Sequence, residues 1–320
     1  MENDSSFWYL KNMTGTFRAG YYSQMSYAKD NFPAIFNQRI KIISRNGVSS
    51  VKYENNKTII PKITLSSRYS RSADELIHFA LTHGLEGIEY TIQVETNEQL
   101  QTEYHIMQAL AASGLEIRYH LQFKEIELSH CDVIHAERSA KYLKDCIDLI
   151  SFLEGRYAIV HLCLGYRNAL HKLRYDHALK YLEEVVSYGN KKNVRVCLEN
   201  LTFGFTCTPS RFLELLKTTG AAATVDIGHA AASPVVKDGI VTAEEFITTV
   251  SQYIQSAHVY DVEVTDKETN HVYHAAPGDK SVMTSRLNAL LQSNCNWWLI
   301  ELGDADEILQ TASFARAVIK

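Results

Sequence analysis

The feature of this sequence that most constrains its fold is a regular alternation of short apolar segments and longer helical ones after residue 62. Apolar runs rich in β-branched residues are expected to form strands at 63–67, 87–92, 116–123, 157–165, 194–201, 222–230, 256–262 and 297–302. Amphipathic helical patterns follow them at 72–84, 96–113, 138–154, 175–189, 209–220, 242–254, 281–293 and 305–319. Such units in succession imply parallel strands joined by right-handed crossovers. Eight strand–helix units in a chain of 320 residues predict an α/β fold, a (β/α)8 TIM barrel. A doubly wound open sheet could also be built from eight such units.

The first 62 residues differ from the rest and are expected to form an N-terminal extension to a barrel domain at 63–320. They carry nine Lys/Arg and four Asp/Glu, whereas the whole chain has a net charge of −5. Asn46-Gly47 separates two alternating apolar runs, which predicts a small β-hairpin. The extension is also rich in aromatic residues. It could stack on single-stranded nucleic acid, but packing on the barrel or on a second subunit of a homodimer is the favoured interpretation.

Composition excludes several classes of protein. The chain is 46% hydrophobic and 22% charged, as globular proteins are, and its net charge of −5 gives no general attraction to nucleic acid or anionic membrane. No run of about 18 apolar residues predicts a membrane span. The N-terminus lacks a basic and apolar leader, and the six cysteines form no CxxC pair. A cytoplasmic protein with free thiols is therefore expected.

From the third expected strand onward, each strand is apolar until a side chain of metal-binding type appears within it or just beyond it. These side chains are His120, His161, Glu199, Asp226, His258 and Glu301, with His229 three residues after Asp226 and His274 in the loop after the seventh strand. Burying so many ionisable groups would cost several kcal/mol each unless a cation compensated them. The strand ends of a barrel meet at one mouth, so a shared metal site is predicted there. Histidines and carboxylates together suit Zn, Mn, Co or Fe, and Mg less well.

These residues resemble the site of the xylose-isomerase-like TIM barrels. The resemblance rests on Glu199 within Leu-Glu-Asn, on Asp226-x-x-His229, on His258, on His274-x-x-Pro-Gly and on Glu301, and it covers residues 63–320. That superfamily includes sugar phosphate isomerases and epimerases, certain dehydratases, and the endonuclease IV-type AP endonucleases of family 2. The pattern is specific for the superfamily but does not choose among its members.

The isomerase and epimerase branch implies a single divalent metal held by Glu199, Asp226, His258 and Glu301. In that branch the two glutamates also carry a proton between substrate carbons by enediolate-type transfer, and His229 would orient a substrate oxygen. The resemblance therefore implies a metal-dependent isomerase or epimerase acting on a small sugar or sugar phosphate, with one Zn, Mn, Co or Mg ion. This interpretation is favoured because the barrel segment is acidic.

The endonuclease IV branch implies a cluster of two or three metals and cleavage of abasic DNA. The eight residues that fall on its pattern are His120, His161, Glu199, Asp226, His229, His258, His274 and Glu301. Val272 departs from it, because the branch has an aspartate there. Binding to duplex DNA also needs Lys and Arg around the mouth, so nucleic acid is the less favoured partner. A metal-binding scaffold without catalytic activity is the third alternative.

Substrate recognition is assigned to loops that would surround the mouth. Lys124, Arg167 and Lys280 lie in such loops and could hold a phosphate or carboxylate of a small-molecule substrate. Each could equally be a solvated loop charge.

Overall fold

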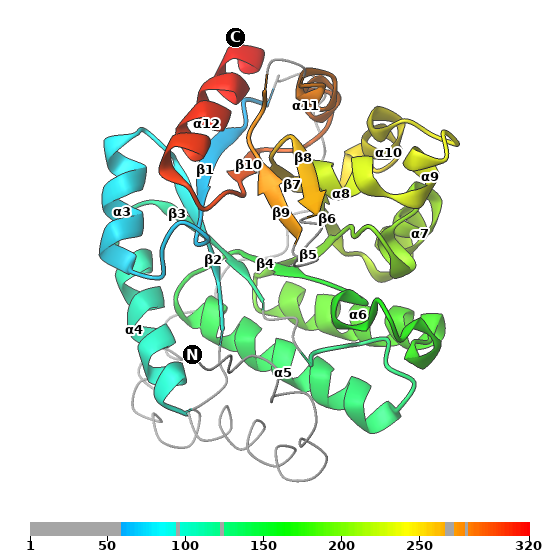
Figure 1. Ribbon diagram of the computed structural model, residues 1–320. Helices are drawn as coiled ribbons and strands as arrows, with labels where there is room; N and C mark the ends of the chain where they lie inside the picture. The colour runs from blue at the N-terminus through cyan, green and yellow to red at the C-terminus, as the bar shows by residue number, and fades with distance from the viewer. Residues whose placement is uncertain (1–58, 94–96, 122–124, 266–271, 279–280) are drawn as a thin grey trace, which may run out of the picture.

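The computed structural model describes residues 59–93, 97–121, 125–265, 272–278 and 281–320. Eight parallel strands close into a barrel in the order β1-β10-β7-β6-β5-β4-β3-β2 (Figure 1). Their bounds are β1 Lys62–Ser66, β2 Gly87–Thr91, β3 Glu116–His120, β4 Tyr157–Val160, β5 Arg195–Glu199, β6 Ala222–Asp226, β7 Ile254–Val259 and β10 Trp297–Ile300. The first and last strands pair in parallel, with Lys62 opposite Trp297. The predicted (β/α)8 barrel is confirmed, and the open sheet is excluded.

Helices between the strands cover the outside of the barrel. They are α3 Ala73–Thr82, α4 Asn97–Ala112, α5 Val133–Phe152, α6 Tyr175–Lys191, α7 Pro209–Thr219, α10 Ala243–Thr249, α11 Met283–Leu291 and α12 Ala305–Ile319. Short helices α8 Ile227–Ala232 and α9 Pro234–Lys237 follow β6. In the described ranges, no helix combines the length and the apolar character needed to cross a membrane.

Two helix boundaries differ from expectation, the first for a local reason and the second for a long-range one. Helix α5 begins at Val133 rather than 138, because the Asp132 side chain accepts a hydrogen bond from the Ile134 backbone N–H. Helix α10 ends at Thr249 rather than 254, because the chain turns there and Ile254 already pairs with Ala223 in the barrel. Long-range pairing thus ends a helix that its sequence pattern could have continued.

The segment after β7 is not the simple loop that was expected. Strands β8 Val262–Thr265 and β9 Val272–Ala275 form an antiparallel hairpin beside α8 (Figure 1). Glu263 lies opposite His274 in this hairpin, so both side chains leave the same face of it. The hairpin therefore places a carboxylate beside a predicted ligand.

A buried arginine fills the barrel at the end where the strands begin. The Arg118 guanidinium lies 3.7 Å from the Tyr157 ring centroid and 4.3 Å from that of Trp297. It donates to the Gln255 carbonyl at 2.9 Å and to Asn296 Oδ1 at 2.9 Å. The predicted functional residues gather at the opposite end of the strands.

The predicted N-terminal hairpin and most of the extension lie outside the described residues. The division at residue 62 and the role of the extension therefore stay predictions. Lys62 already forms the first residue of β1 and is hydrogen-bonded to Glu116 at 2.8 Å.

Candidate metal centre

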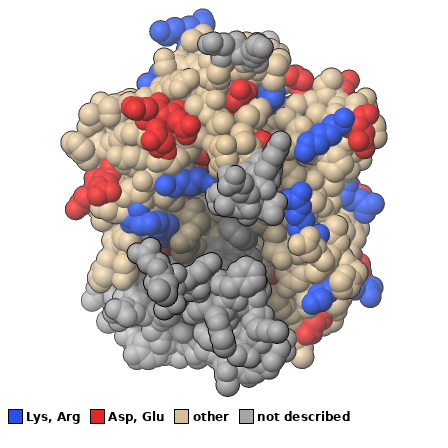
Figure 2. Space-filling view, in the orientation of Figure 1, with Lys and Arg blue, Asp and Glu red and all other residues tan. Residues whose placement is uncertain are grey.

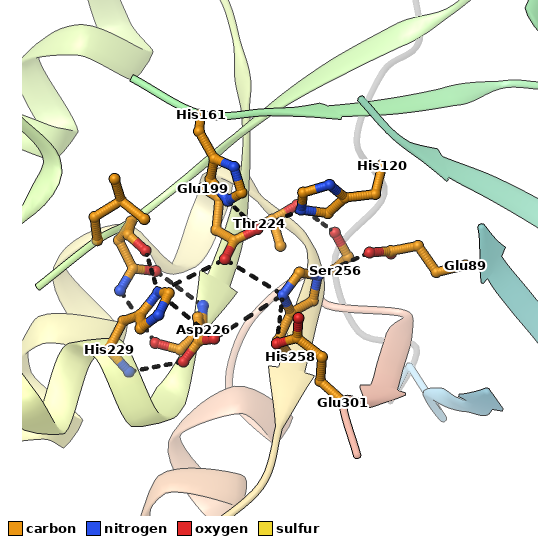
Figure 3. A network of polar contacts seen from close by, with 12 residues as sticks. Glu89, His120, His161, Glu199, Thr224, Asp226, His229, Ser256, His258 and Glu301 are labelled. Carbon is orange, nitrogen blue, oxygen red and sulfur yellow. Dashed lines mark hydrogen bonds and ion pairs between the residues drawn. The ribbon is translucent and has the colours of Figure 1, made fainter. Parts of the chain in front are cut away.

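The predicted ligand residues come together at the carboxyl ends of the barrel strands (Figure 3). Three of them, His120, Glu199 and Asp226, are the last residues of β3, β5 and β6. His161 and Glu301 directly follow β4 and β10. Parallel strands in a barrel end at one rim, so these side chains face one another. Their convergence follows from the strand pattern alone.

Three carboxylates surround one nitrogen of His258. The Nδ1 atom lies 3.2 Å from Glu301 Oε2, 3.4 Å from Glu199 Oε1 and 4.0 Å from Asp226 Oδ2. His258 and Asp226 are completely buried. We call Glu199, Asp226, His258 and Glu301 the quartet. It is the ligand set that the isomerase resemblance implies.

A carboxylate on β2 fixes the orientation of the His258 ring. Glu89 Oε1 lies 2.9 Å from Nε2, and both residues are buried. An ionised carboxylate can only accept, so Nε2 carries the proton and Nδ1 presents its lone pair to the quartet. Glu89 was missing from the expected site, although a lone glutamate within the apolar run Gly87–Thr91 was a signal for it.

The quartet fits a divalent cation. Within the described residues, neither His258 Nδ1 nor Asp226 Oδ2 has a hydrogen-bond partner, although both atoms are buried. A lone pair facing carboxylate oxygens is repelled unless a cation or a proton lies between them. In the metal-free site a proton takes that place: burial lowers the pKa of His258, but Glu199 and Glu301 raise it well above the ordinary value. A Zn, Mn, Co or Fe ion would take the same position when bound.

A second group of ligand atoms lies on the other side of Glu199. Glu199 Oε2 is 3.0 Å from His161 Nε2 and 3.3 Å from His120 Nε2. One ligand atom from each of the three residues lies within 4.8 Å of the others. Burial lowers the pKa of His161, which favours the neutral imidazole that binds metals. The structure thus brings His120 and His161 to the quartet, as predicted.

The Asp-x-x-His motif forms the first turn of a helix. Asp226 caps α8 by accepting the His229 backbone N–H at 2.7 Å on its Oδ1 atom, which also accepts from the Tyr260 hydroxyl at 2.7 Å. His274 stacks on Tyr260 with ring centroids 3.6 Å apart. Asp226, His229 and His274 form a third group whose ligand atoms lie within 4.8 Å of one another. Burial is the main cause that raises the pKa of Asp226 to about 6.

Residues 77–318 match the family model described as xylose isomerase-like TIM barrel, which is most of the chain. The chain belongs to the xylose isomerase-like TIM barrel family. Among curated proteins, an uncharacterized protein of Methanocaldococcus jannaschii is 28% identical over 165 residues, which is 51% of this chain and 67% of that protein.

Solved structures share the fold of this xylose isomerase-like barrel. A D-tagatose 3-epimerase-like protein is 18% identical with a TM-score of 0.64, and the match covers 81% of this chain and 97% of that one. An L-ribulose 3-epimerase is 16% identical with a TM-score of 0.60, covering 81% and 93%. A D-psicose 3-epimerase from Clostridium cellulolyticum, solved with D-tagatose, is 13% identical with a TM-score of 0.60, covering 81% and 99%. At these identities the likeness is one of fold.

Lys and Arg side chains are exposed on the face of this xylose isomerase-like barrel that Figure 2 shows, on both sides of a central hollow. Arg167 is exposed, with its guanidinium 5.5 Å from the Phe203 ring centroid, and Lys124 and Lys280 lie outside the described residues. Their predicted contact with substrate stays a prediction. Arg68, which lies two residues after the end of β1 and was not expected, donates to Glu301 Oε1 at 3.1 Å.

Proposed function

We propose that this chain is a divalent-metal-dependent isomerase or epimerase of a small polyhydroxylated substrate, a sugar or sugar phosphate. The observation that carries this proposal is the position of two glutamates beside one ligand nitrogen. Glu199 and Glu301 lie 3.4 and 3.2 Å from His258 Nδ1, and they approach it from different sides (Figure 3). A substrate carbon bound between them could lose its proton to one carboxylate and receive a different proton, taken from solvent, from the other.

The chemistry follows from the acidity of a C–H bond beside a carbonyl. A divalent cation in the quartet would withdraw electrons from neighbouring carbonyl and hydroxyl oxygens and so acidify the C–H between them. One glutamate then removes that proton, and the other delivers a proton to the opposite face of the carbon. The exchange inverts the configuration at carbon, which is epimerisation.

The protonation states suit a base at neutral pH. Burial raises the pKa of Glu199, but His258 and His161 lower it well below the ordinary value. Burial likewise opposes ionisation of Glu301, but Arg68 and His258 keep its pKa well below the ordinary value. Both carboxylates are therefore ionised in the free site, so either can accept the substrate proton. The other must take up a proton from solvent before it can deliver one to the opposite face of the carbon.

The substrate class rests on the structural neighbours and on the charge at the rim. The similar solved structures named for epimerases of tagatose, ribulose and psicose make ketoses the first substrates to test. Arg68, whose side chain is 50% exposed, stands beside Glu301, where it could bind an anionic group of the substrate. His229 would orient a substrate oxygen, and Lys124, Arg167 and Lys280 remain the predicted contacts from the loops.

Hydrogen exchange in D2O tests the proposal without knowledge of the product. Ketoses and ketose phosphates are incubated with the protein and Mn, Co or Zn, and deuterium at carbon is followed by NMR. We expect metal-dependent exchange that Glu199→Gln and Glu301→Gln each abolish. A metal-loaded wild-type protein that exchanges no C–H of any sugar, inositol or keto acid would contradict the proposal.

A second candidate function is a multi-metal phosphodiesterase acting on abasic DNA. The group formed by His120, His161 and Glu199 favours it, since it offers ligands that a single-metal epimerase does not need. Several cations could activate water and stabilise the leaving oxygen. Nicking of an abasic duplex at low salt with Zn or Mn would support this candidate, and intact duplex under those conditions would eliminate it.

A further inference from the structure

A buried tyrosine beside Asp226 has no part in the chemistry proposed above. Tyr260 follows β7, which ends at Val259, and it is completely buried. Its hydroxyl donates to Asp226 Oδ1 at 2.7 Å. Its ring lies nearly parallel to the His274 ring, with the centroids 3.6 Å apart and 6° between the two planes. A side chain that holds a ligand carboxylate in this way can decide how the carboxylate binds.

The two carboxylate oxygens of Asp226 have different surroundings. Oδ1 accepts two hydrogen bonds of 2.7 Å, one from the Tyr260 hydroxyl and one from the His229 backbone N–H. Oδ2 is buried without a hydrogen-bond partner among the described residues, and it lies 4.0 Å from His258 Nδ1. An oxygen that already accepts two hydrogen bonds has engaged the lone pairs that a cation would need. Oδ2 is therefore the oxygen left to bind an ion in the quartet.

A glycine in the Asp-x-x-His motif makes room for the tyrosine. Gly228 on α8 comes so close that a Cβ at this position would overlap the Cε2 and Cζ atoms of Tyr260. Any side chain at position 228 would therefore displace the ring or α8. On β9, His274 packs on the same ring, and its own Nδ1 atom is bonded to the Glu301 carbonyl oxygen at 3.0 Å. The ring is thus held in the orientation that points its hydroxyl at Asp226.

We infer that Tyr260 is a positioning residue that keeps Asp226 Oδ1 away from the cation and leaves Oδ2 to bind it. The inference rests on the proposed function in one respect, because the quartet must bind a cation. A carboxylate that binds through one oxygen occupies one coordination position instead of two. Tyr260 therefore leaves more positions of the ion for substrate oxygens, and Gly228 serves the same end by admitting the ring.

The test removes the hydroxyl and keeps the ring. Tyr260→Phe retains the stacking on His274 but no longer donates to Asp226. Tyr188→Phe is the matched control, because Tyr188 on α6 also donates to a carboxylate, that of Asp148 on α5, at 2.8 Å. We expect Tyr260→Phe to bind Co about 10-fold more weakly than wild type. It should also change the visible spectrum of bound Co(II), which depends on the number and arrangement of the ligands.

The control separates positioning of the ligand from a general loss of stability. Tyr188→Phe should keep the Co affinity and the spectrum of wild type, even where thermal unfolding shows that its stability has fallen. If folded Tyr260→Phe has the affinity and the spectrum of wild type, the inference is refuted. A wild type that binds no Co refutes the inference and the proposed function together. If wild type exchanges no substrate C–H while Tyr260→Phe alters Co binding as expected, only the proposed function fails.

A crystal structure of the Zn-loaded wild type gives a test that needs no variant. We expect Zn to be bound by Oδ2 of Asp226, with the Tyr260 hydroxyl still hydrogen-bonded to Oδ1. Zn bound by Oδ1, or by both oxygens with the hydroxyl displaced, would overturn the inference.

Discussion

Removal of the Glu89 carboxylate should weaken metal binding in the quartet, although Glu89 is not itself one of its ligands. The Glu89 carboxylate accepts a hydrogen bond from His258 Nε2–H, with Oε1 and Nε2 2.9 Å apart. Glu89 is 1% exposed and His258 is 0% exposed. No water reaches this contact to replace a lost acceptor. Loss of such a support weakens metal affinity about 10- to 100-fold, which is about 1.4 to 2.7 kcal/mol.

Two substitutions of Glu89 should reduce the metal affinity by different amounts within this 10- to 100-fold range. Glu89→Gln keeps an acceptor oxygen near Nε2 without its charge, so about a 10-fold loss is expected. Glu89→Ala leaves the buried N–H unpaired and the ring free to turn, so about a 100-fold loss is expected. Competition with a chromogenic chelator measures the affinity for Zn.

A second buried carboxylate supplies the matched control. Glu127 is as buried as Glu89, but it accepts from the backbone N–H groups of Ser129 and Cys163, and within the described part of the chain it forms no hydrogen bond or ion pair with a quartet residue. Glu127→Gln should lower stability and leave Zn affinity unchanged. If Glu89→Ala binds Zn as tightly as wild type while folded, the role of Glu89 as support of His258 is refuted.

Three further predictions concern the site and the barrel. Asp226→Asn should abolish binding of the quartet ion while circular dichroism shows an intact barrel, and global unfolding would instead make the ion structural. Burial lowers the pKa of His229, but Asp226 and Glu263 raise it to about 10. The folded metal-free protein therefore keeps a proton that the unfolded chain releases near pH 6.5. Its free energy of unfolding in urea should fall as pH rises from about 6.5 to about 10, and His229→Asn should flatten that slope. Arg118→Ala should cost on the order of 3 kcal/mol in urea unfolding, through a cavity and lost buried hydrogen bonds, with unchanged Zn affinity.

The barrel and the quartet could be predicted because both depend on local periodicity. Alternation of β-branched runs with helical patterns gave the strands in order, and a barrel places every strand end at one rim. Glu199, Asp226, His258 and Glu301 therefore meet without any knowledge of loop structure. Their metal-binding and catalytic roles remain predictions that the experiments above test.

The residues that sequence reasoning missed depend on tertiary contacts. Glu263 reaches His229 only because β8 and β9 pair across a segment that carries no clear hairpin signal. Glu89 points at a histidine on another strand, 169 residues away along the chain. Arg118 is buried within β3, and its charge is compatible with burial only through partners far along the chain, Gln255 and Asn296.

Anomalous diffraction from crystals grown with Zn or Mn tests the central claim most directly. The account predicts a peak about 2.0 to 2.3 Å from oxygens of Glu199, Asp226 and Glu301 and from Nδ1 of His258. A fully loaded crystal whose ions all lie elsewhere, with His258 Nδ1 bound to no metal, would contradict it.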